Sequence, residues 1–168
     1  MLSGILSDTL ILTSPTTTYM DKEAVIYLSI IAEVDYKEYG LNMLKAGSSL
    51  KGKTKEEILY TDYKTYPVGE ERIGLGQIST TNPDEILAEK EEYIELLNSI
   101  ADANNYYFVA LFITDIINNG SYVLYSSRGE NILRKVYKDE NLEQGDFLEK
   151  VISRKKQILP GIMLEMGS

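Results

Sequence analysis

The first third of the chain has apolar residues at helical spacing. A helix over about 21–33, with Asp21 as its N-cap, is predicted by apolar positions on one face: Ala24, Val25, Leu28, Ile31 and Ala32. Asp35 can cap a second helix, which Gly47 would end. Thr54 is placed to cap one short helix that reaches about Tyr60. The pattern therefore predicts helices before the first strand.

Strand patterns follow from residue 63 onward. Residues 63–68 and 72–79 have strand character around a Pro-Val-Gly turn at 67–69, which predicts a hairpin. Residues 106–114 form a nearly continuous apolar run, as expected of a central strand that helices cover on both faces. The turn signal Asn-Asn-Gly at 118–120 precedes another predicted strand at 121–127.

Further helices are predicted between and after these strands. The segment Asn-Pro-Asp-Glu at 82–85 is typical of a helix start, with Asn82 as the cap, and an apolar stripe carries this helix to about Asn104. Residues 130–137 could form a short helix, and a terminal strand is expected after residue 157. Helices and strands in this mixed order indicate an α/β fold, a mixed β-sheet flanked by helices.

Length and charge narrow the class of protein. The 168 residues predict one main core, without room for a second full domain. The net charge of -9 argues against nucleic acid or an anionic membrane as a partner. No segment approaches the roughly 18 apolar residues that span a bilayer, and the N-terminus lacks the basic region of a signal peptide, so a cytoplasmic location is expected.

The absence of cysteine and histidine limits the chemistry that this chain can perform. It excludes disulfides, thiolate and imidazole metal ligands, cysteine nucleophiles and a Ser-His-Asp arrangement. Carboxylates, hydroxyls and cationic side chains remain as candidate functional groups. Any anion site in so acidic a chain must be local.

Two short segments could bind an anion. Ser-Arg-Lys-Lys-Gln at 153–157 has three consecutive cations, which could hold a phosphate through charge-assisted hydrogen bonds or could form only a solvated basic turn. Lys45 stands at the end of a predicted helix beside a loop of small residues. It could reach a ligand there, or it could simply interact with the helix dipole.

A third candidate is the carboxylate of Asp8, which lies among apolar residues. Such a carboxylate is costly to bury unless it is paired or bound to a cation, so Asp8 could ligate a hard metal ion. The alternative is an exposed carboxylate at a helix end. One aspartate alone does not make a metal site.

Together these places resemble one family, the family II inorganic pyrophosphatases of the DHH phosphoesterase superfamily. The resemblance covers almost the whole chain and follows the C-terminal half of these enzymes. It rests on four segments: Ser-Gly-Ile-Leu-Ser-Asp-Thr (3–9) with Ser-Pro-Thr (14–16), Met-Leu-Lys-Ala-Gly (43–47), Gly-Leu-Gly-Gln (74–77) and Ser-Arg-Lys-Lys-Gln (153–157). The last segment is the most specific of the four.

The resemblance implies an organisation and a set of site residues. Residues 1–19 would be a remnant of the catalytic DHH domain with its linker, and residues 20–168 the DHH-associated domain that closes over the substrate. Asp8 is implied as a metal ligand, and Lys45, Arg154 and Lys155 as substrate-binding residues. No catalytic residue is expected in this chain itself.

The resemblance also implies partners and cofactors. The substrate would be pyrophosphate, hydrolysed to two phosphates, with manganese (or cobalt, and magnesium as another option) bound mostly by residues that this chain lacks. The N-terminal catalytic domain of the same protein is the expected partner, and a homodimer is a further one. The isolated chain is expected to be inactive.

Two other functions stay open at this point. One is a related phosphoesterase of the same superfamily, such as an exopolyphosphatase that acts on longer chains. The other is a non-catalytic ligand-binding or dimerisation module, which the lack of histidine and the single candidate metal carboxylate would suit.

Overall fold

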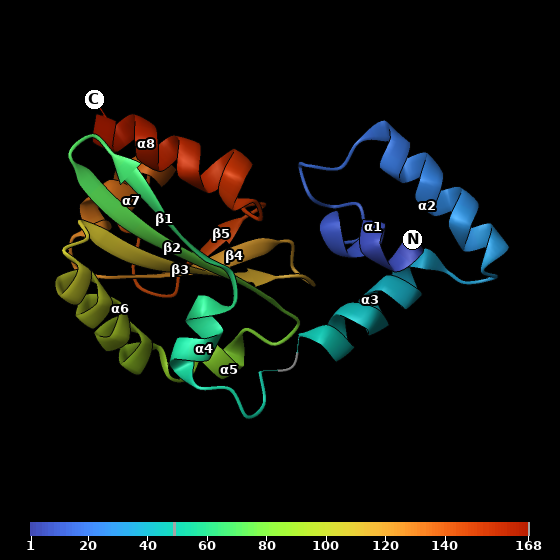
Figure 1. Cartoon of the computed structure of the whole chain (residues 1–168), viewed down its shortest axis with the longest axis horizontal. Helices are drawn as coiled ribbons and strands as arrows, with labels where there is room; N and C mark the ends of the chain where they lie inside the picture. The colour runs from blue at the N-terminus through green and yellow to red at the C-terminus, as the bar shows by residue number, and fades with distance from the viewer. Residues whose placement is uncertain (49, 168) are drawn as a thin grey trace. The chain divides into compact units, whose positions relative to one another are not determined.

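The computed structural model describes residues 1–48 and 50–167, and the chain divides into two compact units, Met1–Ser49 and Leu50–Ser168. The length of the chain had predicted one main core. The smaller unit contains three helices, α1 (Leu2–Asp8), α2 (Tyr19–Ile31) and α3 (Tyr36–Gly47), which are labelled in Figure 1. The boundary at residues 19 and 20, expected from the family resemblance, stays a prediction.

Two of these helices begin with side-chain caps. The N-cap of α2 is Thr18, so the prediction of Asp21 was wrong. Asp21 lies at the third helical position, where its backbone N–H donates to Thr18 Oγ1 at 3.2 Å and its carboxylate accepts from the Thr18 N–H at 2.8 Å. Asp35 caps α3 as predicted, because its Oδ1 accepts from the N–H groups of Lys37 and Glu38 at 2.9 Å each.

The larger unit is built on a mixed sheet, which confirms the predicted fold class. Its strand order is β1-β2-β3-β4-β5, and the β2–β3 pair is parallel while the other pairs are antiparallel. The strands are β1 (Tyr63–Val68), β2 (Glu71–Thr80), β3 (Phe108–Asp115), β4 (Gly120–Tyr125) and β5 (Phe147–Glu149). β1 and β2 form the predicted hairpin. The sequence did not predict β5, which has only three residues.

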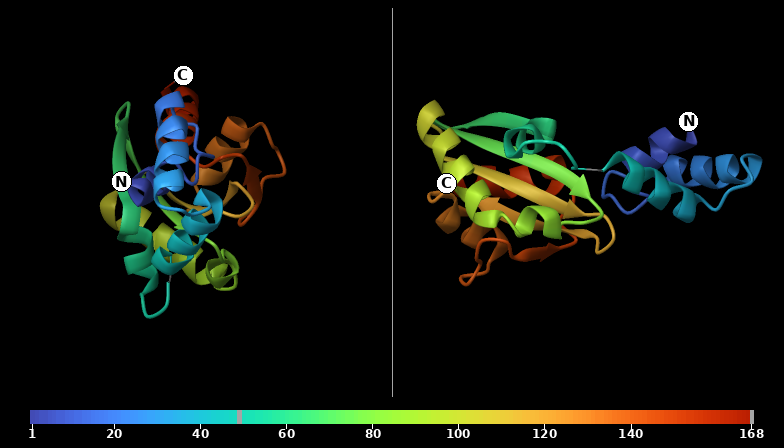
Figure 2. Two further views of the ribbon diagram at one scale, coloured as in Figure 1. Left: turned by 90° about the vertical axis from the view of Figure 1, so that its right-hand side faces the viewer. Right: turned by 90° about the horizontal axis from the view of Figure 1, so that it is seen from below.

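Helices cover both faces of this sheet (Figures 1 and 2). Those of one face are α4 (Lys55–Leu59), α5 (Asp84–Leu87) and α6 (Lys90–Asn104), and those of the other are α7 (Gly129–Tyr137) and α8 (Leu159–Gly167).

The central strand β3 contributes to both hydrophobic clusters. Successive side chains of a strand point to opposite faces, and all eight residues of β3 are buried. Phe108, Ala110 and Phe112 pack in the cluster below α7 and α8. Val109, Leu111 and Ile113 pack in the cluster below α4, α5 and α6. This two-sided burial explains the continuous apolar run in the sequence.

The predicted single helix over residues 82–104 is instead two helices, α5 and α6. Glu89 leaves the helical conformation, with φ of -113° and ψ of 26°, and α6 begins after it. Asn82 does not cap α5, since its side-chain amide donates to Glu85 Oε1 at 2.9 Å. The apolar stripe is shared by both helices and therefore did not reveal the break.

The predicted terminal strand was also wrong. After Ser153 the chain forms a π-helical turn, η2 (Arg154–Ile158), and continues as α8. Ile158 and Ile162 stand four residues apart, and both are fully buried in the same cluster. Helical spacing brings both side chains to the core. Across residues 1–48 and 50–167, no helix has the length and hydrophobicity needed to cross a bilayer.

The two-sided burial of β3 makes a prediction for stability. Ile113 is fully buried, whereas Ile117, in the turn that follows β3, is 56% exposed. We expect Ile113→Ala to lower the free energy of unfolding by about 2–5 kcal/mol, and the matched change Ile117→Ala to alter it by less than about 0.5 kcal/mol. Urea unfolding followed by circular dichroism measures both values. Equal losses would contradict the assignment of β3 as the centre of the core.

Candidate functional site

The basic segment 153–157 is a firmly held turn. Ser153 caps η2, because its Oγ accepts a hydrogen bond from the Lys156 N–H at 3.3 Å. The side-chain oxygen of Gln157 accepts from the N–H groups of Ile152 and Ser153 at 2.9 Å each, and its amide donates to the Lys150 carbonyl at 2.7 Å. The first and last residues of the motif therefore fix the backbone that carries its cations.

The sheet holds the chain just before this turn. Gln77 of β2 donates from Nε2 to Thr114 Oγ1 at 2.9 Å and to the Ile152 carbonyl at 3.0 Å. Ser121 of β4 donates to the Val151 carbonyl at 2.5 Å. The hydroxyls of Thr114 and Ser121 are 2.9 Å apart. Polar side chains from three neighbouring strands therefore anchor residues 151 and 152.

Arg154 is buried, with only 7% of its surface exposed, so it does not belong to a solvated turn. Its Nη1 donates to the carbonyls of Asp62 and Leu75, at 2.6 and 3.1 Å, and its Nη2 donates to Asp62 Oδ1 at 2.6 Å. Asp62 was not predicted from the sequence. Asp62 and Arg154 are 92 positions apart, and no local pattern links them.

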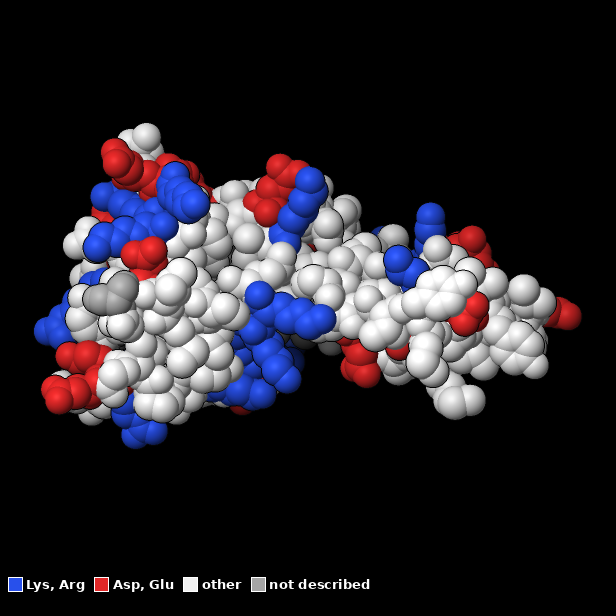
Figure 3. All heavy atoms as spheres, turned by 90° about the horizontal axis from the view of Figure 1, so that it is seen from above, with Lys and Arg blue, Asp and Glu red and all other residues white. Residues whose placement is uncertain are grey.

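Lys155 and Lys156, the next two residues, are exposed. The Lys155 ammonium has no hydrogen-bond or ion-pair partner among residues 1–48 and 50–167. Figure 3 shows mixed positive and negative side chains over part of the larger unit and one area where positive side chains lie together. The motif therefore combines one buried, paired cation with one exposed cation that is available to an anion.

The other two candidates, Lys45 and Asp8, lie in the smaller unit. Lys45 is exposed in the last turn of α3, and its carbonyl accepts from Ser48 Oγ at 3.4 Å. Asp8 is exposed as the last residue of α1. The family resemblance implies that Lys45 binds the same substrate as Arg154 and Lys155, and this stays a prediction because those two residues belong to the other unit.

The described residues do not supply the donor set of a manganese site by themselves. In the part of the chain that the structure describes, no group of three or more Asp, Glu, His or Cys side chains could hold a metal ion. Asp8 would contribute a single carboxylate. Any metal chemistry would thus depend on ligands from elsewhere.

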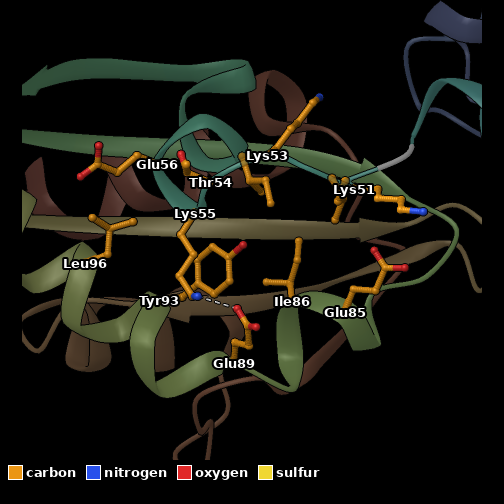
Figure 4. A pocket seen from close by; sticks show the side chains of 12 residues that line it. Lys51, Lys53, Thr54, Lys55, Glu56, Glu85, Ile86, Glu89, Tyr93 and Leu96 are labelled. Carbon is orange, nitrogen blue, oxygen red and sulfur yellow. Dashed lines mark ion pairs between the residues drawn. The ribbon is translucent and has the colours of Figure 1, made fainter.

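A separate groove of about 860 Å³ lies between α4 and the helices α5 and α6 (Figure 4). Lys55 points into it, but its Nζ already lies 2.6 Å from Glu89 Oε2 and 2.7 Å from Glu92 Oε2. Hydrogen bonds to these two carboxylates raise the pKa of Lys55. Burial raises the pKa of Tyr93 to about 12, so its phenol is neutral. Lys51 and Lys53 also line the groove, but Glu56, Glu85 and Glu89 line it too, so it offers no excess of positive charge to an anion.

Comparisons with known proteins agree on one family. The model of the DHHA2 domain matches residues 41–164. A protein of Clostridium acetobutylicum named "Probable manganese-dependent inorganic pyrophosphatase" is 38% identical over 160 residues, which are 95% of this chain and 52% of that protein. A protein of the same name from Staphylococcus carnosus is 40% identical over 162 residues, covering 96% of this chain and 53% of the relative.

A solved structure gives the same result. The crystal structure of a Methanococcus jannaschii protein assigned to family II inorganic pyrophosphatases superposes with a TM-score of 0.86 at 32% sequence identity. The match covers 99% of this chain and 54% of the other. This chain thus spans about half the length of the relatives that it matches. It belongs to the family of manganese-dependent, family II inorganic pyrophosphatases, of which it matches the C-terminal half with its DHHA2 domain.

Proposed function

We propose that this chain is the substrate-closing C-terminal portion of an inorganic pyrophosphatase, which hydrolyses pyrophosphate to two phosphates. The observation that carries the proposal is the similarity to named pyrophosphatases over 95% of the chain. The firmly held turn at 153–157 supports it, since a rigid basic turn suits a phosphate ligand.

In this proposal the chain binds substrate and does not perform the chemical step. Lys45, Arg154 and Lys155 bind the phosphate oxygens and offset the charge that moves to the departing phosphate. Asp8 is one ligand of a manganese cluster, with cobalt or magnesium as alternatives, and the N-terminal catalytic half completes that cluster. The protein acts in the cytoplasm. A homodimer is a further expected assembly.

Two alternatives have different experimental signatures. An exopolyphosphatase would hydrolyse long-chain polyphosphate faster than pyrophosphate, so comparing the two substrates in the full-length enzyme separates them. A non-catalytic binding module would retain phosphate or manganese in equilibrium dialysis of the chain alone. A detached closing domain would hold either ligand only weakly.

The first prediction from the proposed function concerns the purified chain on its own. With pyrophosphate and manganese we expect no appreciable hydrolysis, because metal-assisted catalysis needs several metal ligands and Asp8 is the only one proposed here. Phosphate release measures this, with the Clostridium acetobutylicum relative as the positive control. Turnover of roughly 1 per second or more would contradict the proposal.

The second prediction concerns the cations in the full-length enzyme. Each charged hydrogen bond to phosphate contributes about 1.5–3 kcal/mol, so changing Lys45, Arg154 or Lys155 to Ala should cost about ten- to a hundredfold in kcat/KM. Lys156→Ala should have the smallest effect of the four. Lys64→Ala, which removes an exposed cation of β1, is the matched control. Equal and negligible losses at all four positions would leave the basic segment without a role in binding.

The third prediction separates a metal ligand from a structural carboxylate. Asp8→Asn should weaken manganese binding and activity in the full-length enzyme, because the neutral amide is a poorer ligand for a hard cation. In the isolated chain the same change should leave thermal unfolding nearly unaltered, since Asp8 is exposed there. Strong destabilisation of the isolated chain would show that the carboxylate is structural.

A further inference from the structure

We infer that Asp62 is a positioning residue for substrate binding, which orients the guanidinium of Arg154 so that one edge of it is presented to a phosphate. The inference rests on the proposed function, because it assumes that Arg154 binds pyrophosphate. Neither the sequence pattern nor the similarity to known proteins identifies Asp62. It is assigned from the contacts of the buried guanidinium alone.

The hydrogen bonds of Arg154 leave a specific pair of donors. A guanidinium has five N–H groups in one plane. Three of them are used: two on Nη1, by the carbonyls of Asp62 and Leu75, and one on Nη2, by Asp62 Oδ1. No other hydrogen bond of this guanidinium is formed to residues 1–48 or 50–167.

The remaining donors are Nε–H and the second N–H of Nη2. Asp62 contacts both terminal nitrogens, so it occupies the end of the fork. The two remaining N–H groups then lie on one side edge of the guanidinium plane, the edge away from the Leu75 carbonyl. Two parallel N–H groups match two oxygens of one phosphate, the geometry that makes arginine binding bidentate. Asp62 thereby selects which edge of the guanidinium can meet a ligand.

The location of Asp62 makes this orientation rigid. Asp62 ends the short 3-10 helix η1 (Tyr60–Asp62) and immediately precedes β1, so the sheet fixes its backbone. A long, flexible arginine side chain loses rotamer entropy when it binds a ligand. The contacts with Asp62 and Leu75 remove much of this freedom before the substrate arrives.

Asp62 also makes two neighbouring cations differ, because it pairs with Arg154 and not with Lys155. Its carboxylate offsets the charge of Arg154, which is buried and would be costly to leave unpaired. Arg154 therefore supplies directed hydrogen bonds, while the exposed ammonium of Lys155 supplies net positive charge. The negative charge of Asp62 by itself opposes the binding of pyrophosphate. Its contribution to binding in this inference is that it orients the N–H donors of Arg154.

The test uses steady-state kinetics of the full-length enzyme with Asp62→Ala, Arg154→Ala and the double variant. We expect Asp62→Ala to raise KM for pyrophosphate about tenfold, with a much smaller change in kcat. Asp62→Asn, which keeps an oxygen acceptor, should restore part of the loss. The double variant should be no worse than Arg154→Ala alone, because Asp62 acts through Arg154. Asp102→Ala, which removes an exposed carboxylate of α6, is the matched control and should match the unaltered enzyme.

Two outcomes separate this inference from the proposed function. If Arg154→Ala has unaltered kinetics, Arg154 does not bind substrate, and the site of the proposed function fails with the inference. If Arg154→Ala raises KM but the folded Asp62→Ala variant does not, only the inference is overturned. Multiplicative effects in the double variant would also overturn it, since they would show independent roles.

A second measurement needs no variant at position 62. The chain has four arginines, so its ¹⁵N spectrum contains four Nε–H signals to assign. On titration with millimolar pyrophosphate we expect the Arg154 Nε–H signal to shift, with chloride at matched ionic strength as the control. A shift of the Lys155 signals without any shift of the Arg154 Nε–H signal would overturn the inference even if Asp62→Ala fails to fold.

Discussion

The burial of β3 on both faces is the constraint on which the larger unit depends. Its alternating side chains enter two separate hydrophobic clusters, so helices must cover both sides of the sheet. The apolar positions end at Thr114, where polar groups begin. Because Gln77 and Ser121 lie beside it, the end of the hydrophobic core becomes the support for the basic turn.

This arrangement reconciles an acidic chain with the anionic substrate that we propose for it. A net charge of -9 repels pyrophosphate at long range, but salt screens that repulsion beyond about 8 Å. Contacts at hydrogen-bond distance are screened much less, so a few fixed donors can dominate the local field. The value of the turn at 153–157 therefore lies in how firmly its donors are held, rather than in how many cations it has.

The sequence revealed what depends on local pattern and missed what depends on distant contacts. Strand segments around a Pro-Val-Gly turn predicted the hairpin, a continuous apolar run predicted β3, and the Asp35 cap predicted α3. The sequence misplaced the start of α2, because either Thr18 or Asp21 could serve as the cap of a capping box. It missed the break at Glu89 and the pairing of Asp62 with Arg154, since no residue near either position encodes them. The motif at 153–157 showed where cations lie but not that one of them is buried.

The hydrogen bonds of Arg154 also limit which substitutions this protein can accept at position 154 during evolution. They satisfy the carbonyls of Asp62 and Leu75 as well as a carboxylate, and a lysine, with all its donors on one nitrogen, could not reproduce that planar fork. Replacing the arginine would remove a donor from both backbone carbonyls, so the contacts around Asp62 would change together with the proposed anion site. Positions 62 and 154 should therefore covary among homologues, and either one should rarely change alone.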